Sequence, residues 1–182
     1  MSSSKQFLEL LQAKQTLIWI WGRDEKRIEQ ELIKGASSVK RLTRTWDCAD
    51  GIVDAITGQS IAADIIQPEE ALKRIDGFNE SAIYILRDFQ LIADPFSQRK
   101  LLNLARKFRS TSPAKALVVL AGTNDIPPAI GNHAAVIEWD LPTRDELHSS
   151  IQTIIKNHQD RLTAIAPGQN YNPSPELAVD AV

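Results

Sequence analysis

Two continuous apolar runs constrain the fold more than any other feature of the chain. The first, Thr16–Trp21, combines β-branched and aromatic residues, and the second, Lys115–Ala121, is almost entirely aliphatic. Runs without polar alternation are typical of strands covered on both faces, as in a parallel sheet. Gly22 ends the first run, and the charged segment Arg23–Lys34 follows with its apolar residues at helical spacing. These segments predict a strand, a turn and a helix of an α/β domain.

Strands and helices are predicted to alternate along the rest of the chain. The other expected strands are Val39–Trp46, Ser81–Arg87 and Ala134–Asp140. The expected helices are Phe7–Ala13, Asp50–Thr57, Pro68–Ile75, Asp94–Arg109 and one that begins after Thr143 and ends near His158. Because such alternation requires right-handed crossovers, it predicts a three-layer α/β sandwich with a mainly parallel sheet of five strands.

Three residues predict where individual helices begin, where they end and which side they bury. Pro68 suits the first turn of its helix, where a backbone N–H is not needed. Gly35 is expected to end the helix that begins at Arg23, as glycine commonly does. Phe96 is expected on the buried stripe of the helix Asp94–Arg109.

Composition excludes several classes of function. The chain has 182 residues, of which 43% are hydrophobic and 24% charged, and its net charge is −2. This balance supplies no bulk positive field for nucleic acid or an anionic membrane. Cys48 is the single cysteine, and no apolar run approaches a bilayer span or a signal peptide. We therefore expect a protein of the cytoplasm or the plastid stroma, with no membrane span and no nucleic-acid partner.

The loop after Trp21 lacks the residues of a phosphate cradle. Ligands of doubly wound sheets bind beyond the carboxyl ends of the strands, so this loop is the natural place for one. A P-loop needs close-approaching glycines, a lysine and a hydroxyl residue. The segment Gly22–Arg27 has one glycine and no Gly-Lys-Ser/Thr, and it places Asp24 and Glu25 where an anion would lie. A self-capped helix start is the favoured interpretation, with residual nucleotide binding as the alternative.

Two further loops carry candidate residues. Asp88 ends an apolar strand, as the Mg²⁺ ligand of ATPases does, but Phe89 follows it where an acidic residue would activate water. Asn124 follows the strand Lys115–Ala121 and could contact a γ-phosphate. Both residues are also ordinary turn formers, and that alternative stays open.

No catalytic or metal site is predicted. The histidines His133, His148 and His158 do not have metal-ligand spacing, and no nucleophile elbow or Cys-x-x-Cys pair occurs. Five basic residues gather between Arg99 and Arg109, which indicates either a solvated helix face or a contact surface for an acidic partner.

The order of these segments resembles the core of an AAA-type ATPase. A first strand, a strand ending at Asp88, a strand followed by Asn124 and a last strand leading to Leu141-Pro142 are arranged as in that family. Within it, the chain is most similar to the N-terminal region of the AAA proteins of cyanobacteria and red-algal plastids named hypothetical chloroplast reading frame 46. The matching stretches are Leu8–Leu11, Thr16–Ile20, Glu25–Glu31, Tyr84–Phe89, Asp94-Pro95, Ile126–Pro128 through Pro142, and Pro173–Leu177.

The resemblance implies which residues of this chain occupy the nucleotide-site positions of the family. Asp88 falls on the metal-aspartate position and Asn124 on the sensor position, as vestigial nucleotide-site residues, while the phosphate lysine and catalytic glutamate have no counterpart. The segment Ala129–Ala134 has no arginine to serve as a finger for a neighbouring subunit. Residues 1–166 are thus expected to form a degenerate AAA-like domain, and residues 167–182 a linker and the beginning of a helical lid in a truncated chain.

The implied function is non-catalytic. The domain is expected to act in assembly, regulation or client contact for a downstream AAA module, as part of a homo-oligomer. ATP and Mg²⁺ would serve that module rather than this segment, and the family suggests a role in photosynthesis or inorganic-carbon use. The alternatives are a free-standing interaction module derived from an ATPase core and a divergent ATP-binding protein.

Overall fold

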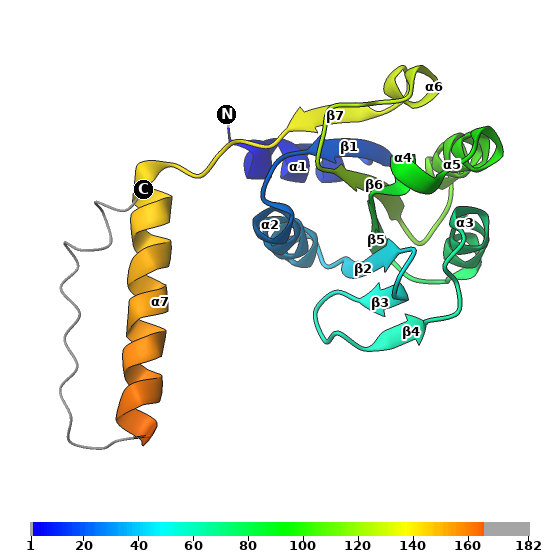
Figure 1. Cartoon of the computed structure of the whole chain (residues 1–182). Helices are drawn as coiled ribbons and strands as arrows, with labels where there is room; N and C mark the ends of the chain where they lie inside the picture. The colour runs from blue at the N-terminus through cyan, green and yellow to red at the C-terminus, as the bar shows by residue number, and fades with distance from the viewer. Residues whose placement is uncertain (1, 166–182) are drawn as a thin grey trace. The chain divides into compact units, whose positions relative to one another are not determined.

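Seven strands form one sheet in the order β4-β3-β2-β5-β6-β1-β7 (Figure 1). The strands are β1 (Leu17–Trp21), β2 (Leu42–Asp47), β3 (Gly51–Asp54), β4 (Ser60–Ala62), β5 (Ala82–Arg87), β6 (Lys115–Ala121) and β7 (Ala135–Glu138). The five strands β2, β5, β6, β1 and β7 pair in parallel, whereas β3 and β4 pair antiparallel beside β2. The predicted α/β fold with five parallel strands is confirmed, and a hairpin is added at one edge.

The computed structural model describes residues 2–165, which fall into two compact units that divide between Leu141 and Pro142. The first unit contains α1 (Ser3–Gln12), α2 (Glu25–Ser38), α3 (Pro68–Gly77), α4 (Phe89–Ile92), α5 (Pro95–Phe108) and α6 (Pro128–Gly131). The second contains α7 (Arg144–Ile165), which is longer than predicted. The linker and lid start predicted for residues 167–182 lie outside the described residues. No helix of the described part is long and apolar enough to cross a membrane.

The central strands are buried on both faces, which explains their unbroken apolar sequences. Leu17, Trp19 and Val119 belong to one core cluster, which α3 and α5 cover, whereas Ile18 and Val118 belong to a second cluster, which α1 and α2 cover. Successive side chains of a strand point to opposite faces, so each strand contributes to both clusters. The sandwich therefore has helices on both sides of the sheet (Figure 1).

The segment Asp50–Thr57 is not helical as predicted, because it contains strand β3. Val53 lies opposite Thr45 and Ile52 lies opposite Trp46 in an antiparallel ladder with β2. Gly51 has a φ of +68°, and a Cβ atom there would collide with the Ala62 carbonyl oxygen. Only glycine adopts this conformation at low cost, and the turn is what folds β3 back onto β2.

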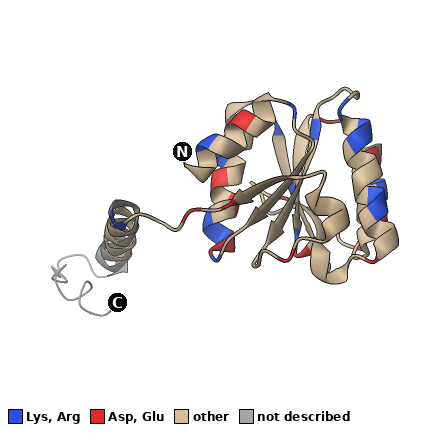
Figure 2. Ribbon diagram, turned by 90° about the horizontal axis from the view of Figure 1, so that it is seen from above, with Lys and Arg blue, Asp and Glu red and all other residues tan. Residues whose placement is uncertain are grey.

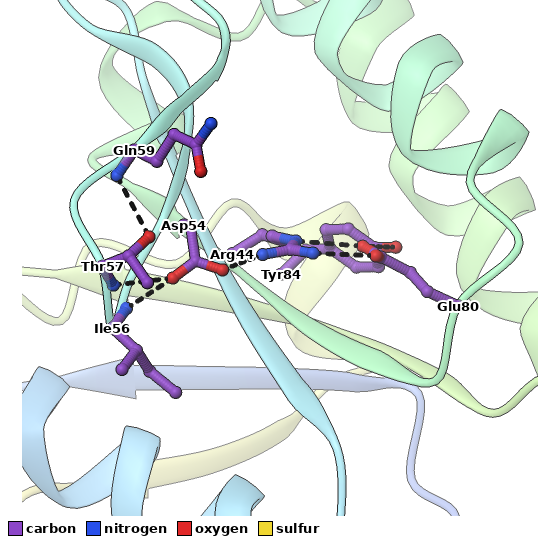
Figure 3. A network of polar contacts seen from close by, with 7 residues as sticks. All are labelled: Arg44, Asp54, Ile56, Thr57, Gln59, Glu80 and Tyr84. Atoms are coloured by element: carbon purple, nitrogen blue, oxygen red, sulfur yellow. Dashed lines mark hydrogen bonds and ion pairs between the residues drawn. The ribbon is translucent and has the colours of Figure 1, made fainter.

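A polar network fastens this hairpin to the sheet (Figure 3). The Arg44 guanidinium donates two hydrogen bonds to the Glu80 carboxylate, at 3.1 and 3.0 Å, and it pairs with Asp54. Asp54 also accepts the amides of Ile56 at 3.0 Å and Thr57 at 2.8 Å, so it closes the turn after β3. The hairpin is thus held by ladder hydrogen bonds and by a half-buried ion pair.

Two details of the helices differ from the sequence predictions. Gly35 does not end α2, which continues to Ser38, and the Phe7 ring packs where a side chain on Gly35 would lie, 3.1 Å from its Cβ position. Phe96 is not buried, because 62% of its surface is exposed at the first turn of α5. Pro68 does occupy the first turn of α3, as predicted.

Candidate functional site

The carboxyl ends of the parallel strands bring together the residues singled out in the sequence. At this edge β1 leads to Gly22, β5 leads to Asp88, and β6 leads to the segment Gly122–Asn124. The strands β5, β6 and β1 are consecutive neighbours in the sheet, so the three loops lie along one edge. We call this the carboxyl edge; it is where ligands of such sheets bind.

The loop between β1 and α2 is too short and too filled to surround a phosphate. It consists of Gly22, Arg23 and Asp24, whereas the P-loop motif runs over about eight residues. A Cβ atom on Gly22 would lie 2.7 Å from Ile28 Cδ1 and 3.1 Å from Trp139 Cβ, so these side chains occupy the space above the strand end. A phosphate would have to displace them.

The start of α2 satisfies its own backbone donors. Asp24 is the N-cap residue, and its carboxylate accepts the Arg27 amide at 3.1 Å. Glu25 occupies the first turn. Burial, with Asp88 and Glu29 nearby, raises the pKa of Glu25 even though Arg87 opposes the shift. Carboxylates therefore stand at the positive end of the helix dipole, where a phosphate would bind in a P-loop protein. The predicted self-capped helix start is confirmed.

Arg87 is the residue that the sequence interpretation missed. It ends β5, and its Nε and Nη2 atoms each donate to the Glu29 carboxylate at 2.9 Å. Its Nη1 atom donates to Asp47 at 2.9 Å, at the end of β2. The guanidinium thus joins two strands to helix α2. A charged last residue on an apolar strand, facing Glu25 and Glu29 at helical spacing, was the available signal.

The electrostatics of this cluster are internally balanced. Burial opposes ionisation of Asp47, but the Asp50 and Ala49 amides and the Arg87 guanidinium together hold the pKa of Asp47 below its ordinary value. Burial likewise disfavours the Arg87 cation, but the Glu29 and Asp47 carboxylates together outweigh burial and raise the pKa of Arg87. Arg87 is therefore held by carboxylates and is not available to a phosphate.

Asp88 directly follows β5. Its φ is 49°, in the left-handed region, and its amide donates to the Leu120 carbonyl at 3.0 Å. Its carboxylate is 3.5 Å from Gln90 Nε2, and no group of three or more potential metal ligands occurs in residues 2–165. Phe89, which follows Asp88, is fully buried, and its ring lies edge-on to the Trp46 ring with 6.1 Å between centroids.

Asn124 lies at the same edge, beyond β6, and its side chain is exposed. Its carbonyl accepts the Ile126 amide at 3.0 Å, and the neighbouring Thr123 hydroxyl donates to Asp125 at 2.8 Å. These contacts form a turn before Pro127. The structure places Asp88 and Asn124 after adjacent strands, and their assignment as vestigial nucleotide-site positions stays a prediction.

Basic residues, blue in Figure 2, lie along α5, and acidic residues of α3 neutralise part of their charge. Lys100 pairs with Glu69 at 3.1 Å, and Lys107 pairs with Asp76 at 2.6 Å. Arg99 and the other arginines of this cluster are exposed. The helix face is therefore less positively charged than its sequence suggests.

Sequence comparison identifies the family. The family described as "SpoVK-like AAA ATPase, N-terminal domain" matches residues 3–139, which include every strand of the sheet. The chain belongs to this family. Among curated proteins, none matches the sequence of this AAA domain.

Solved AAA-type structures share the fold. The domain is similar to a DNA replication initiation factor, with 12% identity, a TM-score of 0.53, and coverage of 98% of this chain and 53% of that one. It is also similar to PCH-2 of C. elegans, with 10% identity, a TM-score of 0.54, and coverage of 96% and 48%. A third is the replication initiator DnaA bound to AMPPCP and single-stranded DNA, at 13% identity, a TM-score of 0.50, and coverage of 85% and 50%. The chain spans about half the length of these structures.

Proposed function

We propose that this domain is a non-catalytic AAA-like domain that acts in assembly, regulation or client contact for an AAA module of the same protein. The observation that carries the proposal is the closed loop between β1 and α2, in which Asp24 caps the helix and Ile28 and Trp139 fill the space above Gly22. Phosphoryl transfer depends on positioned positive charge and metal. The one cation joining these strands to α2, Arg87, is bound by carboxylates instead.

The proposed partner is a downstream AAA module. The family match describes an N-terminal domain of an AAA ATPase, which supports a role beside a second, competent unit. ATP and Mg²⁺ would be cofactors of that unit, and its homo-oligomeric assembly would include this domain. The net charge of −2 supports protein partners over nucleic acid.

The finer biological role rests on the resemblance to AAA proteins of cyanobacteria and red-algal plastids. We propose a role in the regulation of photosynthesis or inorganic-carbon use, in the cytoplasm or the plastid stroma. Growth of a deletion strain at limiting inorganic carbon tests this role. Unchanged growth and carbon uptake would contradict it.

Calorimetric titration of Mg²⁺-ATP into the 182-residue chain tests the absence of a nucleotide site. We expect no saturable heat, and we expect the same for Asp88→Ala and Asn124→Ala variants. Saturable binding with a dissociation constant near the micromolar range, about −8 kcal/mol, would overturn the proposal. Loss of that binding in the two variants would then identify a divergent ATP-binding protein.

Deletion of this domain from the longer protein tests the supporting role. We expect the AAA module to retain ATP hydrolysis, with altered assembly measured by light scattering or altered stimulation by its client. A deletion variant with wild-type assembly and wild-type stimulation would favour the free-standing interaction module.

A further inference from the structure

A cavity lies at the edge of the sheet opposite the carboxyl edge, where the parallel strands begin. Its volume is about 270 Å³. Three loops surround it: the one between α1 and β1, the one between α2 and β2, and the one between α5 and β6. We call this the amino edge. The amino edge lies at the beginning of the parallel strands and the carboxyl edge at their end, so the two are separated by the length of the strands.

The charged residues that line this cavity are all basic. Its lining includes Lys14, Arg41, Arg109 and Lys115, and among the described residues no Asp or Glu contributes to it. Lys115 is buried, and its Nζ atom donates to the Ile75 and Asp76 carbonyls of α3 at 3.0 Å each. The other three basic side chains form no ion pair with residues 2–165.

Arg41 lines the cavity from the loop between α2 and β2. It is half-buried, and its Nη2 atom donates to the Leu11 carbonyl at 3.1 Å. Burial alone lowers the pKa of Arg41, since no carboxylate is close enough to oppose the shift. A desolvated cation without an opposite charge is costly, so an anion bound here would stabilise it.

Three residues of the α5–β6 loop that carry hydroxyl and amide donors, Ser110, Thr111 and Ser112, line the same cavity. Ser110 donates its hydroxyl to the Lys107 carbonyl at 3.2 Å. Thr111 and Ser112 also line the cavity, and their amides and hydroxyls make no hydrogen bond within the described part of the chain. Arginine, lysine and paired N–H and O–H donors are the groups that bind phosphate oxygens.

Helix dipoles explain part of this arrangement. The helices α1, α2 and α5 all end at the amino edge, and cations suit their negative ends. The bond from Arg41 to Leu11 is such a contact. The dipoles do not explain why three loops direct cations and unpaired hydroxyls to one cavity without a carboxylate. Asp76 and Glu80 act favourably on the Lys115 cation, but Lys14, Arg41 and Arg109 have no carboxylate partner among residues 2–165, so an anion would reduce the repulsion among them.

We propose that this cavity binds a small phosphate dianion, either inorganic phosphate or a small phosphate ester. The cavity volume lies below the range of about 300–1,000 Å³ that is usual for larger organic ligands, which favours a small anion. The site is separate from the carboxyl edge, so it does not depend on the proposed function.

Titration of inorganic phosphate into the ¹⁵N-labelled chain, at constant ionic strength with chloride as the balancing anion, tests the proposal. We expect saturable shifts of the Thr111 and Ser112 amide signals, with a dissociation constant of about 1 mM or below. Parallel titrations with glycerol 3-phosphate and pyrophosphate distinguish the sources, because the tighter-binding anion indicates the natural form. Sulfate measures the contribution of charge and shape alone.

Variants of the cavity sharpen the test. Arg41→Gln is expected to weaken binding about tenfold or more, because a charge-assisted hydrogen bond is lost. The side chains of Lys14 and Arg109 are exposed and donate no hydrogen bond to residues 2–165, so Lys14→Gln and Arg109→Gln should fold. These two variants keep the test valid if Arg41→Gln does not fold. Arg23→Gln, at the carboxyl edge, has the same charge change and is expected to leave binding unchanged.

Two results would overturn the proposal. One is the absence of saturable shifts with any of the phosphate anions. The other is equal weakening by Arg23→Gln and the cavity variants, which would indicate an unspecific response to net charge. Neither result bears on nucleotide binding at the carboxyl edge.

Discussion

The half-buried arginines at the two edges of the sheet have different partners. At the carboxyl edge, Arg87 donates to Glu29 and Asp47. At the amino edge, Arg41 has the Leu11 carbonyl as its partner and no carboxylate among the described residues. In a P-loop ATPase the carboxyl edge is the one that keeps free positive groups for phosphate. Here the half-buried arginine of the carboxyl edge is neutralised by carboxylates, whereas the half-buried arginine of the opposite edge has no carboxylate partner among residues 2–165. The proposed position of an anion site therefore follows from the local charge balance and not from the fold alone.

The largest effect on stability is expected from substitution of Phe89, a fully buried residue just beyond the carboxyl end of β5. Phe89→Ala should lower the free energy of unfolding by about 3–5 kcal/mol, because a fully buried ring is lost and a cavity is left. Urea unfolding followed by tryptophan fluorescence measures this. Phe96→Ala on the neighbouring helix is the control, with a change within about 0.5 kcal/mol because its ring is largely exposed. Equal losses in both variants would show that Phe89 does not belong to the core.

The next effect tests the comparison of the edges directly. Arg87→Ala should destabilise the fold by about 1–3 kcal/mol, because it leaves Glu29 and Asp47 half-buried without their partner. Arg109→Ala at the amino edge should leave stability unchanged or slightly raised, since it relieves repulsion among cations. Both are measured by urea unfolding at low salt. Similar losses at the two edges would contradict the difference in charge balance.

Gly22 tests how tightly the phosphate position is filled. Gly22→Ala should lower the free energy of unfolding by about 1–2 kcal/mol, because its Cβ would crowd Ile28 and Trp139. Gly122→Ala, after the neighbouring strand, meets nothing within 4 Å and should have little effect. A double variant with Ile28→Val should recover part of the loss. A neutral Gly22→Ala would mean that this space is open.

The smallest effect concerns pH. The pKa of Asp47 is lower in the folded chain than its ordinary value of 3.8, so ionised Asp47 stabilises the fold above that value. The contribution is lost as pH falls through the folded-state pKa. Asp47→Asn should therefore cost about 1 kcal/mol at neutral pH, and the difference from wild type should shrink below pH 3.8. A difference that is independent of pH would exclude the ion pair with Arg87 as its cause.

Much of the fold could be predicted because the central strands are buried on both faces, and burial on both faces produces continuous apolar sequences. Lys115–Ala121 is buried along its whole length, as its aliphatic sequence indicates. The segment Asp50–Thr57 was predicted wrongly because its partner, β2, is what makes it a strand. Pairing between segments overrides local preference at such positions. The helix end predicted at Gly35 was also wrong. The Phe7 ring packs against this glycine from α1, and α2 continues to Ser38.

The candidate site could be predicted only in part. The loops after Trp21, Leu86 and Ala121 were expected to share an edge, and the sheet order brings them there. Whether Asp88 and Asn124 once served a nucleotide stays a prediction. Arg87 was missed because its partner Glu29 is 58 residues away in sequence.

The sequence by itself determined which segments form buried strands and that the turn at Gly22 lacks a lysine and hydroxyl for phosphate. These properties are local, because apolar runs and motif residues can be read along the chain. Only the tertiary structure decided which charges meet. Crossovers bring Arg87 to Glu29 and bring three loops to the cavity around Arg41. Local periodicity can place a charge on one face of an element, but it does not identify the distant partner of that charge.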